Sequence, residues 1–250
     1  MSLLGGEGGA RLQEFVRHLV ELRRRLLYAA LAIFAVFVAL LPFANRLFVA
    51  LAAPMTAALP RGGGLIATRV TAPFIVPLKV AFLVALFVTA PFTLYQLWAF
   101  VAPGLYRHER RHIRAFLAAA VSLFYAGTAF CYFAILPLAF HFFDRVAPAG
   151  VRVMTDIGSY LTFTLHLMLA FGLVFETPVV LALLVALGLV RHEALRRHRR
   201  YAFLICFVIA AFVAPPDALS MILLGTPMYL LYELGILFSR RWARPPRSIS

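Results

Sequence analysis

Two acidic residues lie in strongly basic stretches of this 250-residue chain, and their surroundings give them the chemistry to bind a cation. Glu21 stands in RLQEFVRHLVELRRRL, and Glu109 stands in RHERRHIR as one acid among four arginines. Such a carboxylate stays ionised and is neutralised locally unless an incoming cation displaces its neighbours. Because a guanidinium can bind a carboxylate through two parallel hydrogen bonds, Glu21 and Glu109 could form a selective site for two arginines.

A simpler interpretation of Glu21 is the solvated face of a surface helix. Residues 11–23 have apolar positions at the spacing of an amphipathic helix lying along the membrane interface, namely Leu12, Phe15, Val16, Leu19 and Leu22. Arg17 and Arg25 each lie four residues from Glu21, and such pairs add only a few tenths of a kcal/mol. The residues alone leave both interpretations open.

Glu176, in LAFGLVFETPVV, is an acid inside an apolar stretch. A charged carboxylate at that depth costs several kcal/mol, so we expect Glu176 to be protonated, paired or facing water, and we favour a functional role. Pro178 frees backbone carbonyls in the same turn and predicts a kinked, polar, concave face. Thr162 and His166 lie near one face with it at helical pitch, and His166 is expected to be a satisfied core histidine rather than a proton carrier.

The remaining intramembrane and helix-end residues have simpler structural explanations. Asp217 follows two prolines and is expected to cap a helix, as is Asp156 with help from Ser159. Glu233 could snorkel or pair with Arg240 or Arg241. The two cysteines, Cys131 and Cys206, lie in apolar runs without metal-ligand spacing and are interpreted as core thiols.

Catalytic motifs give no support to an enzyme. The chain has no GxSxG, no HExxH and no phosphate-binding glycine loop, since the run at 62–64 lacks the lysine and the preceding strand. We therefore predict a protein that is not an enzyme and that holds no metal and no cofactor. Any work that it does must come from a partner or from the membrane potential.

The elements that position these residues are long apolar helices. The chain is 63% hydrophobic with a mean hydropathy of +0.91, which predicts one all-α integral membrane domain over residues 1–250. Six spans are expected, at about 24–44, 73–99, 112–141, 158–188, 199–214 and 218–238. The last two are unusually short or interrupted, residues 45–72 are expected to contain a short helix and an ordered turn, and 241–250 to form a flexible tail.

Basic residues accumulate on one side of these spans. Of the 24 lysines and arginines, 18 fall in the N-terminal tail, the 100–114 and 189–200 loops and the C-terminus. The net charge of +14 is therefore a positive-inside bias that places both termini in the cytoplasm, and nucleic acid is not the predicted partner. Aromatic residues from 92 to 106 are explained mostly by an interfacial belt.

An ordered series of motifs resembles the TatC family, the multi-spanning subunit of the twin-arginine protein translocase: HLVELRRRL, APMT, LYQLWAFVAPGLYRHERR, SYL, FGLVFETPVV, APPD and PMYLLYELGI. The resemblance runs through about residues 11–241 and implies a six-helix, glove-like fold in a bacterial inner membrane. It also implies a receptor that binds twin-arginine signal peptides of folded proteins, with small single-span subunits and further copies of itself as partners and the proton motive force as the energy source.

The same resemblance implies roles for individual residues. It implies a signal-peptide-binding patch comprising Glu21, Arg23, Phe100, Leu105 and Glu109. It implies intramembrane polar or partner contacts at Glu176, Asp217 and Tyr132, and structural prolines at Pro54 and Pro91. Met221 departs from the family, which commonly has a glutamine there, so the docking of partner helices at this position is in question.

Two rival functions remain on the sequence alone. A proton-coupled small-molecule transporter would use Glu176 and His166, although the chain lacks the internal repeat from which secondary transporters are often built. An assembly scaffold for a respiratory complex would leave Glu21 and Glu109 without a task. Indifference to mutation at both acids would favour the scaffold.

Overall fold

The chain folds as a set of long helices in the computed structural model, which describes residues 4–58, 65–101, 113–140, 155–213 and 218–240. The helices are α1 (Leu4–Leu40), α2 (Ala44–Ala58), α3 (Ala72–Val101), α4 (Ile113–Phe130), α6 (Ile157–Val174), α7 (Thr177–Ala186), α8 (His192–Arg197), α9 (Arg199–Val213) and α10 (Ala218–Ser239). A 3₁₀ turn, Leu41–Phe43, joins α1 to α2, and a π-helical turn, Cys131–Ile135, follows α4. The fold is thus all-α, as its apolar runs predict.

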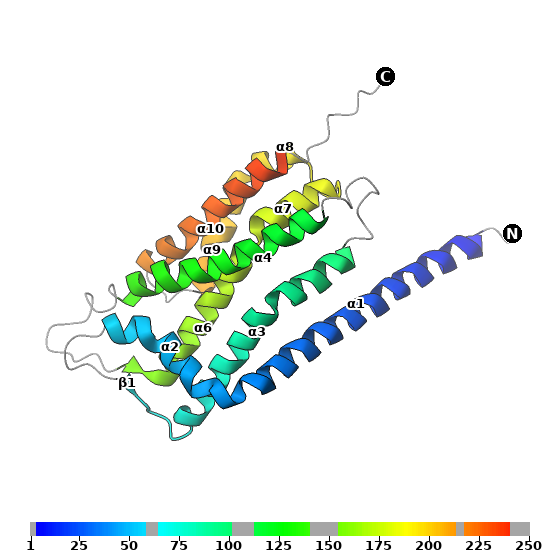
Figure 1. Cartoon of the computed structure of the whole chain (residues 1–250). Helices are drawn as coiled ribbons and strands as arrows, with labels where there is room; N and C mark the ends of the chain where they lie inside the picture. Colours follow the sequence, from blue (N-terminus) through cyan, green and yellow to red (C-terminus); the bar gives the residue numbers. More distant parts are fainter. Residues whose placement is uncertain (1–3, 59–64, 102–112, 141–154, 214–217, 241–250) are drawn as a thin grey trace.

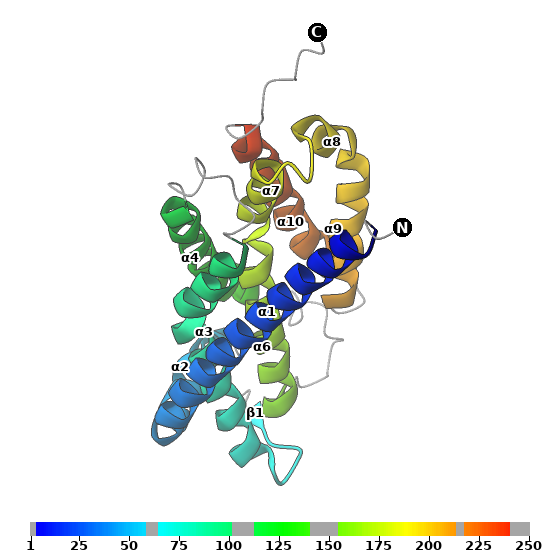
Figure 2. The ribbon, with the colours of Figure 1, turned by 90° about the vertical axis from the view of Figure 1, so that its right-hand side faces the viewer.

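The helices pack through a series of pairwise contacts. α1 lies beside α3 at one edge, α4 lies against α6, and α10 packs on both α7 and α9 (Figure 1). Figure 2 shows α1 running obliquely past the other helices. The start of α1, α8 and the end of α10 all lie toward the upper-right end of the molecule in Figure 1, whereas α2 and β1 lie at the opposite end.

Four stretches of helix are long and apolar enough to cross a membrane within the described residues: Val16–Ala53, Ala72–Phe100, Arg114–Phe140 and Ile157–Ala186. α9, with 15 residues, is shorter than these stretches. At 1.5 Å per residue it extends about 22 Å, less than the roughly 30 Å hydrocarbon core of a bilayer. The 22-residue α10 has Pro227 in its interior.

The first helix differs from the sequence-based expectation. Residues 11–23 do not form a separate interfacial helix, because α1 continues without a break from Leu4 to Leu40. The physical reason is local: residues 22–27, where the expected interfacial helix meets the first span, read LRRRLL, and leucine and arginine are both good helix formers. Glu21 therefore lies on the same rigid rod as the first apolar span.

The expected short helix between the first two long helices is present as α2. Beyond it, β1 (Leu65–Ile66) pairs in parallel with β2 (Thr155–Asp156), which precedes α6. Asp156 caps α6 as predicted, accepting hydrogen bonds from the backbone N–H (2.8 Å) and hydroxyl (2.9 Å) of Ser159. Its other oxygen accepts from the hydroxyl (2.6 Å) and N–H (3.1 Å) of Thr68. The Thr68 hydroxyl, followed by these N–H groups, holds the pKa of Asp156 well below its usual range.

The fourth apolar stretch is two helices. α6 ends at Val174 and α7 begins at Thr177, leaving Phe175 and Glu176 in a turn. Pro178 accounts for this break, because it has no N–H to donate to Val174 and its ring would clash with that carbonyl in a continuous helix. The kink predicted at Pro178 is therefore present, and it lies where α6 meets α7, next to the buried Glu176.

Candidate functional site

The described part of the predicted signal-binding patch lies between the middle of α1 and the last turns of α3. We call His18, Glu21, Arg25, Gln96 and Phe100 the α1–α3 patch. Arg25 donates to Glu21 Oε1 from Nη2 at 2.6 Å and from Nε at 3.1 Å. The side chain of Glu21 keeps 29% of its exposure, so its carboxylate is accessible as well as held in place.

The second helix contributes an aromatic ring to this patch. Phe100 on α3 stacks on His18 of α1, with ring centroids 4.2 Å apart and planes inclined by 29°. His18 lies three residues before Glu21, so Phe100 and Glu21 are placed about one helical turn apart along α1. The structure thus brings together two residues that the sequence separates by 79 positions.

Sequence reasoning found the Glu21–Arg25 pair from its four-residue spacing but missed Gln96. Arg25 Nη1 donates to Gln96 Oε1 at 3.4 Å, which links the ion pair on α1 to α3. Gln96 is a polar residue near the end of a mostly apolar helix, in LYQLWAF, and this position could have indicated a polar contact. Helix spacing could not provide its partner, because the contact depends on how α1 and α3 pack.

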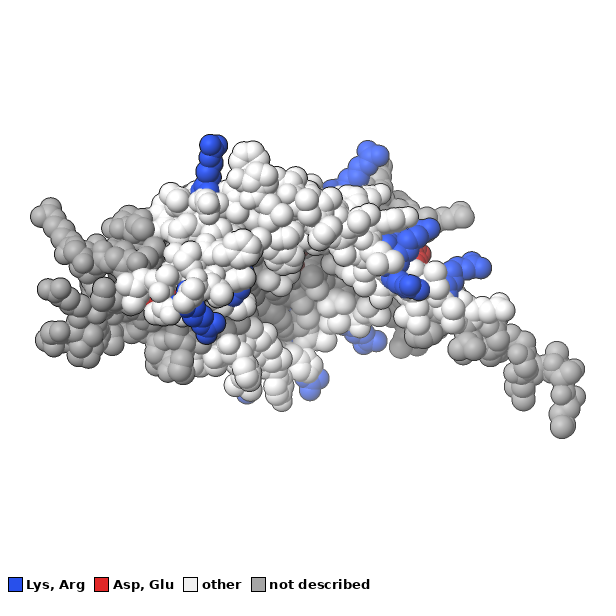
Figure 3. All heavy atoms as spheres, turned by 90° about the horizontal axis from the view of Figure 1, so that it is seen from below, with Lys and Arg blue, Asp and Glu red and all other residues white. Residues whose placement is uncertain are grey.

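Of the other predicted members of the patch, the structure describes only Arg23. Arg23 is exposed on α1, and no described side chain pairs with it in an ion pair. Leu105 and Glu109 lie outside the described residues. Seen from below, most of the molecular surface is uncharged, and basic side chains gather toward the right-hand side of the view with an acidic group among them (Figure 3).

A second polar feature is the carboxyl group of Glu176, in the turn between α6 and α7. Glu176 is only 8% exposed, and its Oε1 has no hydrogen-bond partner within the described part of the chain. The surrounding packing is tight. If Gly127 of α4 were replaced by a residue with a Cβ, that atom would lie 2.6 Å from the Phe171 carbonyl oxygen and from the Phe175 ring. A buried carboxyl oxygen without a partner is costly, which supports a functional rather than a structural role.

His166 does not join Glu176. The imidazole of His166 is exposed on the surface of α6, so the expectation of a satisfied core histidine is wrong. The helix is apolar all around, and its periodicity could not show which side faces the interior. Because Glu176 is buried and lies ten residues along the chain, or about 15 Å along a helix axis, the two groups do not form a direct proton relay.

Tyr132 and Pro54 are linked through one backbone carbonyl group, that of Ala50. Pro54 lies in α2 and has no N–H, so it cannot bond to the carbonyl four residues earlier, that of Ala50. The Tyr132 hydroxyl donates to the Ala50 carbonyl at 2.9 Å. This hydrogen bond fastens the π-helical turn after α4 to α2.

Pro91 has the same arrangement on α3. The carbonyl that it leaves without a helical partner is that of Phe87, and the hydroxyl of Tyr125 on α4 donates to it at 2.8 Å. In both cases the backbone acceptor left by the proline accepts a hydrogen bond from a tyrosine of another segment. Met221 lies in α10 and is half-buried, and Asp217 lies outside the described residues.

Glu233 on α10 pairs with a different arginine from those expected. Its Oε2 lies 2.9 Å from Nη2 of Arg199, and its Oε1 accepts a 2.8 Å hydrogen bond from Tyr229. Arg199 begins α9, which packs along α10, whereas sequence proximity pointed to Arg240 or Arg241.

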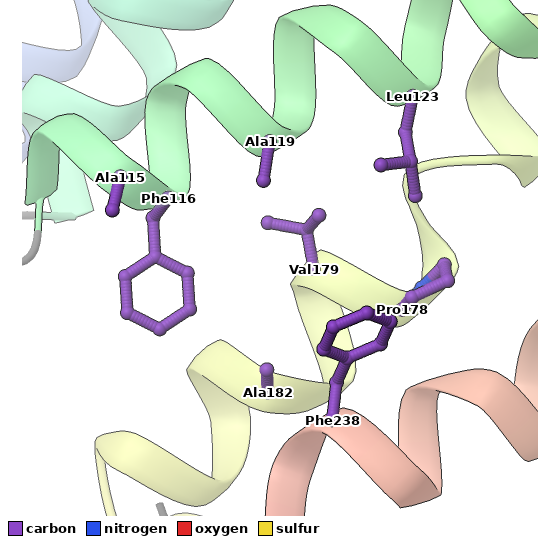
Figure 4. A pocket seen from close by; sticks show the side chains of 8 residues that line it. All are labelled: Ala115, Phe116, Ala119, Leu123, Pro178, Val179, Ala182 and Phe238. Atoms are coloured by element: carbon purple, nitrogen blue, oxygen red, sulfur yellow. The ribbon is translucent and has the colours of Figure 1, made fainter. Parts of the chain in front are cut away.

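An apolar cavity lies between α4, α7 and α10 and has a volume of about 160 Å³. Figure 4 shows Pro178 and Val179 of α7 between α4 and the ring of Phe238 from α10. Its lining is entirely apolar and comprises Ala115, Phe116, Ala119, Leu123, Pro178, Val179, Ala182 and Phe238. Such a lining suits a hydrocarbon segment and offers no group for acid–base chemistry.

Fold and site together define an all-helical membrane protein with polar groups at the end of an apolar bundle and at one interior turn. The family model for "Sec-independent protein translocase protein (TatC)" matches residues 17–227. The TatC protein of Escherichia coli K12 is 46% identical over 228 residues, which cover 91% of this chain and 88% of that protein. The TatC protein of Halothiobacillus neapolitanus is 48% identical over 226 residues, which cover 90% of this chain but 62% of that protein's length.

A solved structure is also similar throughout. The crystal structure of the twin-arginine translocase receptor TatC superimposes with a TM-score of 0.81 at 35% identity, covering 91% of this chain and all of the other. A second crystal structure of that receptor, in DDM, gives a TM-score of 0.80 at 33% identity. The chain therefore belongs to the TatC family of Sec-independent protein translocase proteins.

Proposed function

We propose that this chain is the translocase subunit that binds the twin-arginine signal peptides of folded proteins. The observation that carries the proposal is the placement of Glu21, an accessible carboxylate fixed on the rigid α1 beside the Phe100 ring of α3. A guanidinium pair needs such a fixed acceptor, since a preorganised carboxylate loses little side-chain freedom on binding.

The existing Glu21–Arg25 ion pair sets how the signal binds. Both Arg25 bonds go to Oε1, so an incoming guanidinium can approach the other oxygen or replace Arg25, which keeps Gln96 as an acceptor. Arg25 thus prevents the carboxylate from remaining an uncompensated charge when no signal is bound. Glu109 is the proposed acceptor for the second signal arginine, with Leu105 and the exposed Arg23 bordering the site.

The apolar part of the signal is proposed to lie near Glu176, whose buried carboxyl is the polar contact inside the membrane. The apolar cavity that begins at Pro178 is a suitable neighbour for a hydrocarbon-rich segment. Small single-span subunits are the proposed partners of the region around Asp217 and Met221, and self-association completes the complex.

The proposed topology has six crossings, with the short α9 and α10 as the last two and both termini in the cytoplasm. The arginine distribution supports this orientation, because the basic loops and both chain ends fall on one side. The protein is proposed to reside in the bacterial inner membrane and to act without catalysis, with the proton motive force as the energy source.

Capture by immobilised peptides tests this function. The purified protein should be retained by a signal peptide that contains Arg-Arg and much less by the same peptide with Lys-Lys, because lysine cannot make the bidentate contact. Equal retention by the two peptides would show that the patch reads charge alone, and the proposal would be abandoned.

A further inference from the structure

A separate hollow with a basic rim lies between α8, α9 and α10. Its volume is about 770 Å³, and its polar lining comprises His192, Arg196, Arg199, Glu233 and Arg240. Three guanidiniums face one carboxylate, so the rim has a net charge of +2 when the imidazole is neutral. This excess of positive charge favours an anion.

The charges on the rim are unequally engaged. Glu233 is held by Arg199 at 2.9 Å and by the Tyr229 hydroxyl at 2.8 Å. Arg196 and Arg240 are exposed, and neither forms an ion pair with another described residue. The carboxylate is thus neutralised inside the protein, and two guanidiniums remain to face a ligand.

The other wall of the hollow is apolar. Leu230, Leu234 and Leu237 lie along one face of α10 at intervals of four and three residues, and they are 57%, 45% and 62% exposed. This stripe runs along the helix to Arg240. A basic rim continuous with an exposed leucine stripe matches an amphiphile that has an anionic head and hydrocarbon chains.

Hydrogen bonds fix the shape of this hollow before any ligand binds. His192 Nδ1 lies 3.0 Å from the hydroxyl of Ser239, which is fully buried, and the Tyr232 hydroxyl donates to the Leu195 carbonyl at 2.8 Å. These contacts hold the short α8 on the last turns of α10. The rim is therefore preorganised, which reduces the entropy lost on binding.

We propose that this hollow binds an anionic phospholipid of the cytoplasmic leaflet. The phosphate lies between Arg196 and Arg240, and an acyl chain lies along the leucine stripe of α10. The assignment to this leaflet rests on the proposed topology, whereas the lipid site itself is independent of signal-peptide binding. Basic hollows between helices on the cytoplasmic side are the places where anionic headgroups bind membrane proteins.

Lipid retention by the full chain tests the proposal. The protein is purified in detergent, titrated with phosphatidylglycerol or phosphatidylcholine, and the bound lipid is counted by native mass spectrometry. We expect phosphatidylglycerol to be retained and the double variant Arg196→Gln/Arg240→Gln to bind it about 25-fold more weakly, since each of the two arginines near an anionic headgroup contributes roughly a factor of five. Arg196→Lys/Arg240→Lys should retain most of the binding, because lysine keeps the positive charge at both positions.

Arg197→Gln/Arg200→Gln is the matched control. These two arginines are exposed on the same α8–α9 segment but line a different hollow, so their loss should leave phosphatidylglycerol binding within about twofold of the original. Equal losses in the two double variants would overturn the proposal. Full competition by inorganic phosphate alone would also overturn it, because the hollow would then be a simple anion site. Unchanged lipid binding in Arg196→Gln/Arg240→Gln, together with loss of a co-purifying single-span protein, would overturn it as well.

Retention by the Arg-Arg peptide is measured on the same samples. It should be unaffected in Arg196→Gln/Arg240→Gln, because the α1–α3 patch shares no residue with this hollow. Loss of lipid binding with intact peptide capture supports the lipid site. Because the two measurements are independent, a wrong lipid site can be distinguished from a wrong signal-peptide site.

Discussion

The ring of Phe100 on α3 stacks on the imidazole of His18 on α1, with centroids 4.2 Å apart. The contact fixes the end of α3 next to the turn of α1 that bears Glu21. It therefore places an aromatic residue of one helix and an acid of another on the same surface.

Removal of this ring should weaken signal-peptide binding. Phe100→Ala loses a stacked contact worth about 0.5–1.5 kcal/mol, so peptide affinity is expected to fall about two- to twelvefold. Phe100→Tyr keeps the stack and should bind nearly normally. Fluorescence anisotropy of a labelled Arg-Arg peptide provides the measurement, and equal affinities of the Ala and Tyr variants would contradict a role for the ring.

The proline–tyrosine pairs predict an unusual coupling in stability. Tyr125→Phe leaves the Phe87 carbonyl without its donor, which should lower the free energy of unfolding by about 1–3 kcal/mol. In Pro91→Ala/Tyr125→Phe the new N–H can reach that carbonyl, so the loss should be smaller than in Tyr125→Phe alone.

The measurement is thermal unfolding in detergent for the complete double-mutant cycle. Tyr201→Phe, which alters an exposed tyrosine on α9, serves as the control and should change little. Strict additivity of the Pro91 and Tyr125 changes would show that the hydroxyl does not compensate for the proline.

The cap of α6 predicts a dependence on pH. The pKa of Asp156 is lowered in the folded protein, so its ionised form stabilises the fold at pH values above the ordinary carboxyl pKa of about 4. That contribution is lost as pH falls through the lower folded value. Asp156→Asn retains one acceptor oxygen and should be less stable than the original protein at pH 7, with the difference shrinking below about pH 4.

Unfolding midpoints measured from pH 7 to pH 3 test this prediction. Thr68→Val is the matched variant, because it removes the hydroxyl that donates to Asp156 at 2.6 Å and keeps the N–H contact. A difference between the original protein and Asp156→Asn that is constant over the whole range would contradict the role assigned to the charge.

The buried Glu176 predicts a conflict between stability and function. Replacing a carboxyl that has an unpaired buried oxygen by an apolar side chain of similar size, as in Glu176→Leu, should raise the free energy of unfolding by about 1–3 kcal/mol. If Glu176 serves the translocase, the same variant should export less of a folded reporter carrying a twin-arginine signal. Higher stability with normal export would remove Glu176 from the functional residues.

Local patterns in the sequence predicted part of this arrangement. The Glu21–Arg25 pair and the Asp156–Ser159 cap depend on residues three or four positions apart, and both are present in the structure. The apolar runs also indicated the all-helical membrane fold. Glu176 was recognised because a carboxyl group is incongruous in an apolar run.

Contacts between different helices could not be predicted from the sequence. The partner of Glu233 is Arg199 rather than Arg240, because α9 lies along α10. The exposure of His166 could not be inferred either, since α6 is apolar on all sides. The proline–tyrosine hydrogen bonds join segments tens of residues apart, and only helix packing determines which hydroxyl reaches which carbonyl.

The most direct test of the central proposal is the affinity of the Arg-Arg peptide for Glu21→Gln. The variant keeps the size of the side chain but removes the charge, and the loss of a charge-assisted contact of about 1.5–3 kcal/mol should weaken binding at least tenfold. Glu193→Gln is the matched control: this exposed acid also stands among arginines, on α8, and its neutralisation should leave the affinity unchanged. Equal affinities for the original protein and Glu21→Gln would contradict the account of signal recognition.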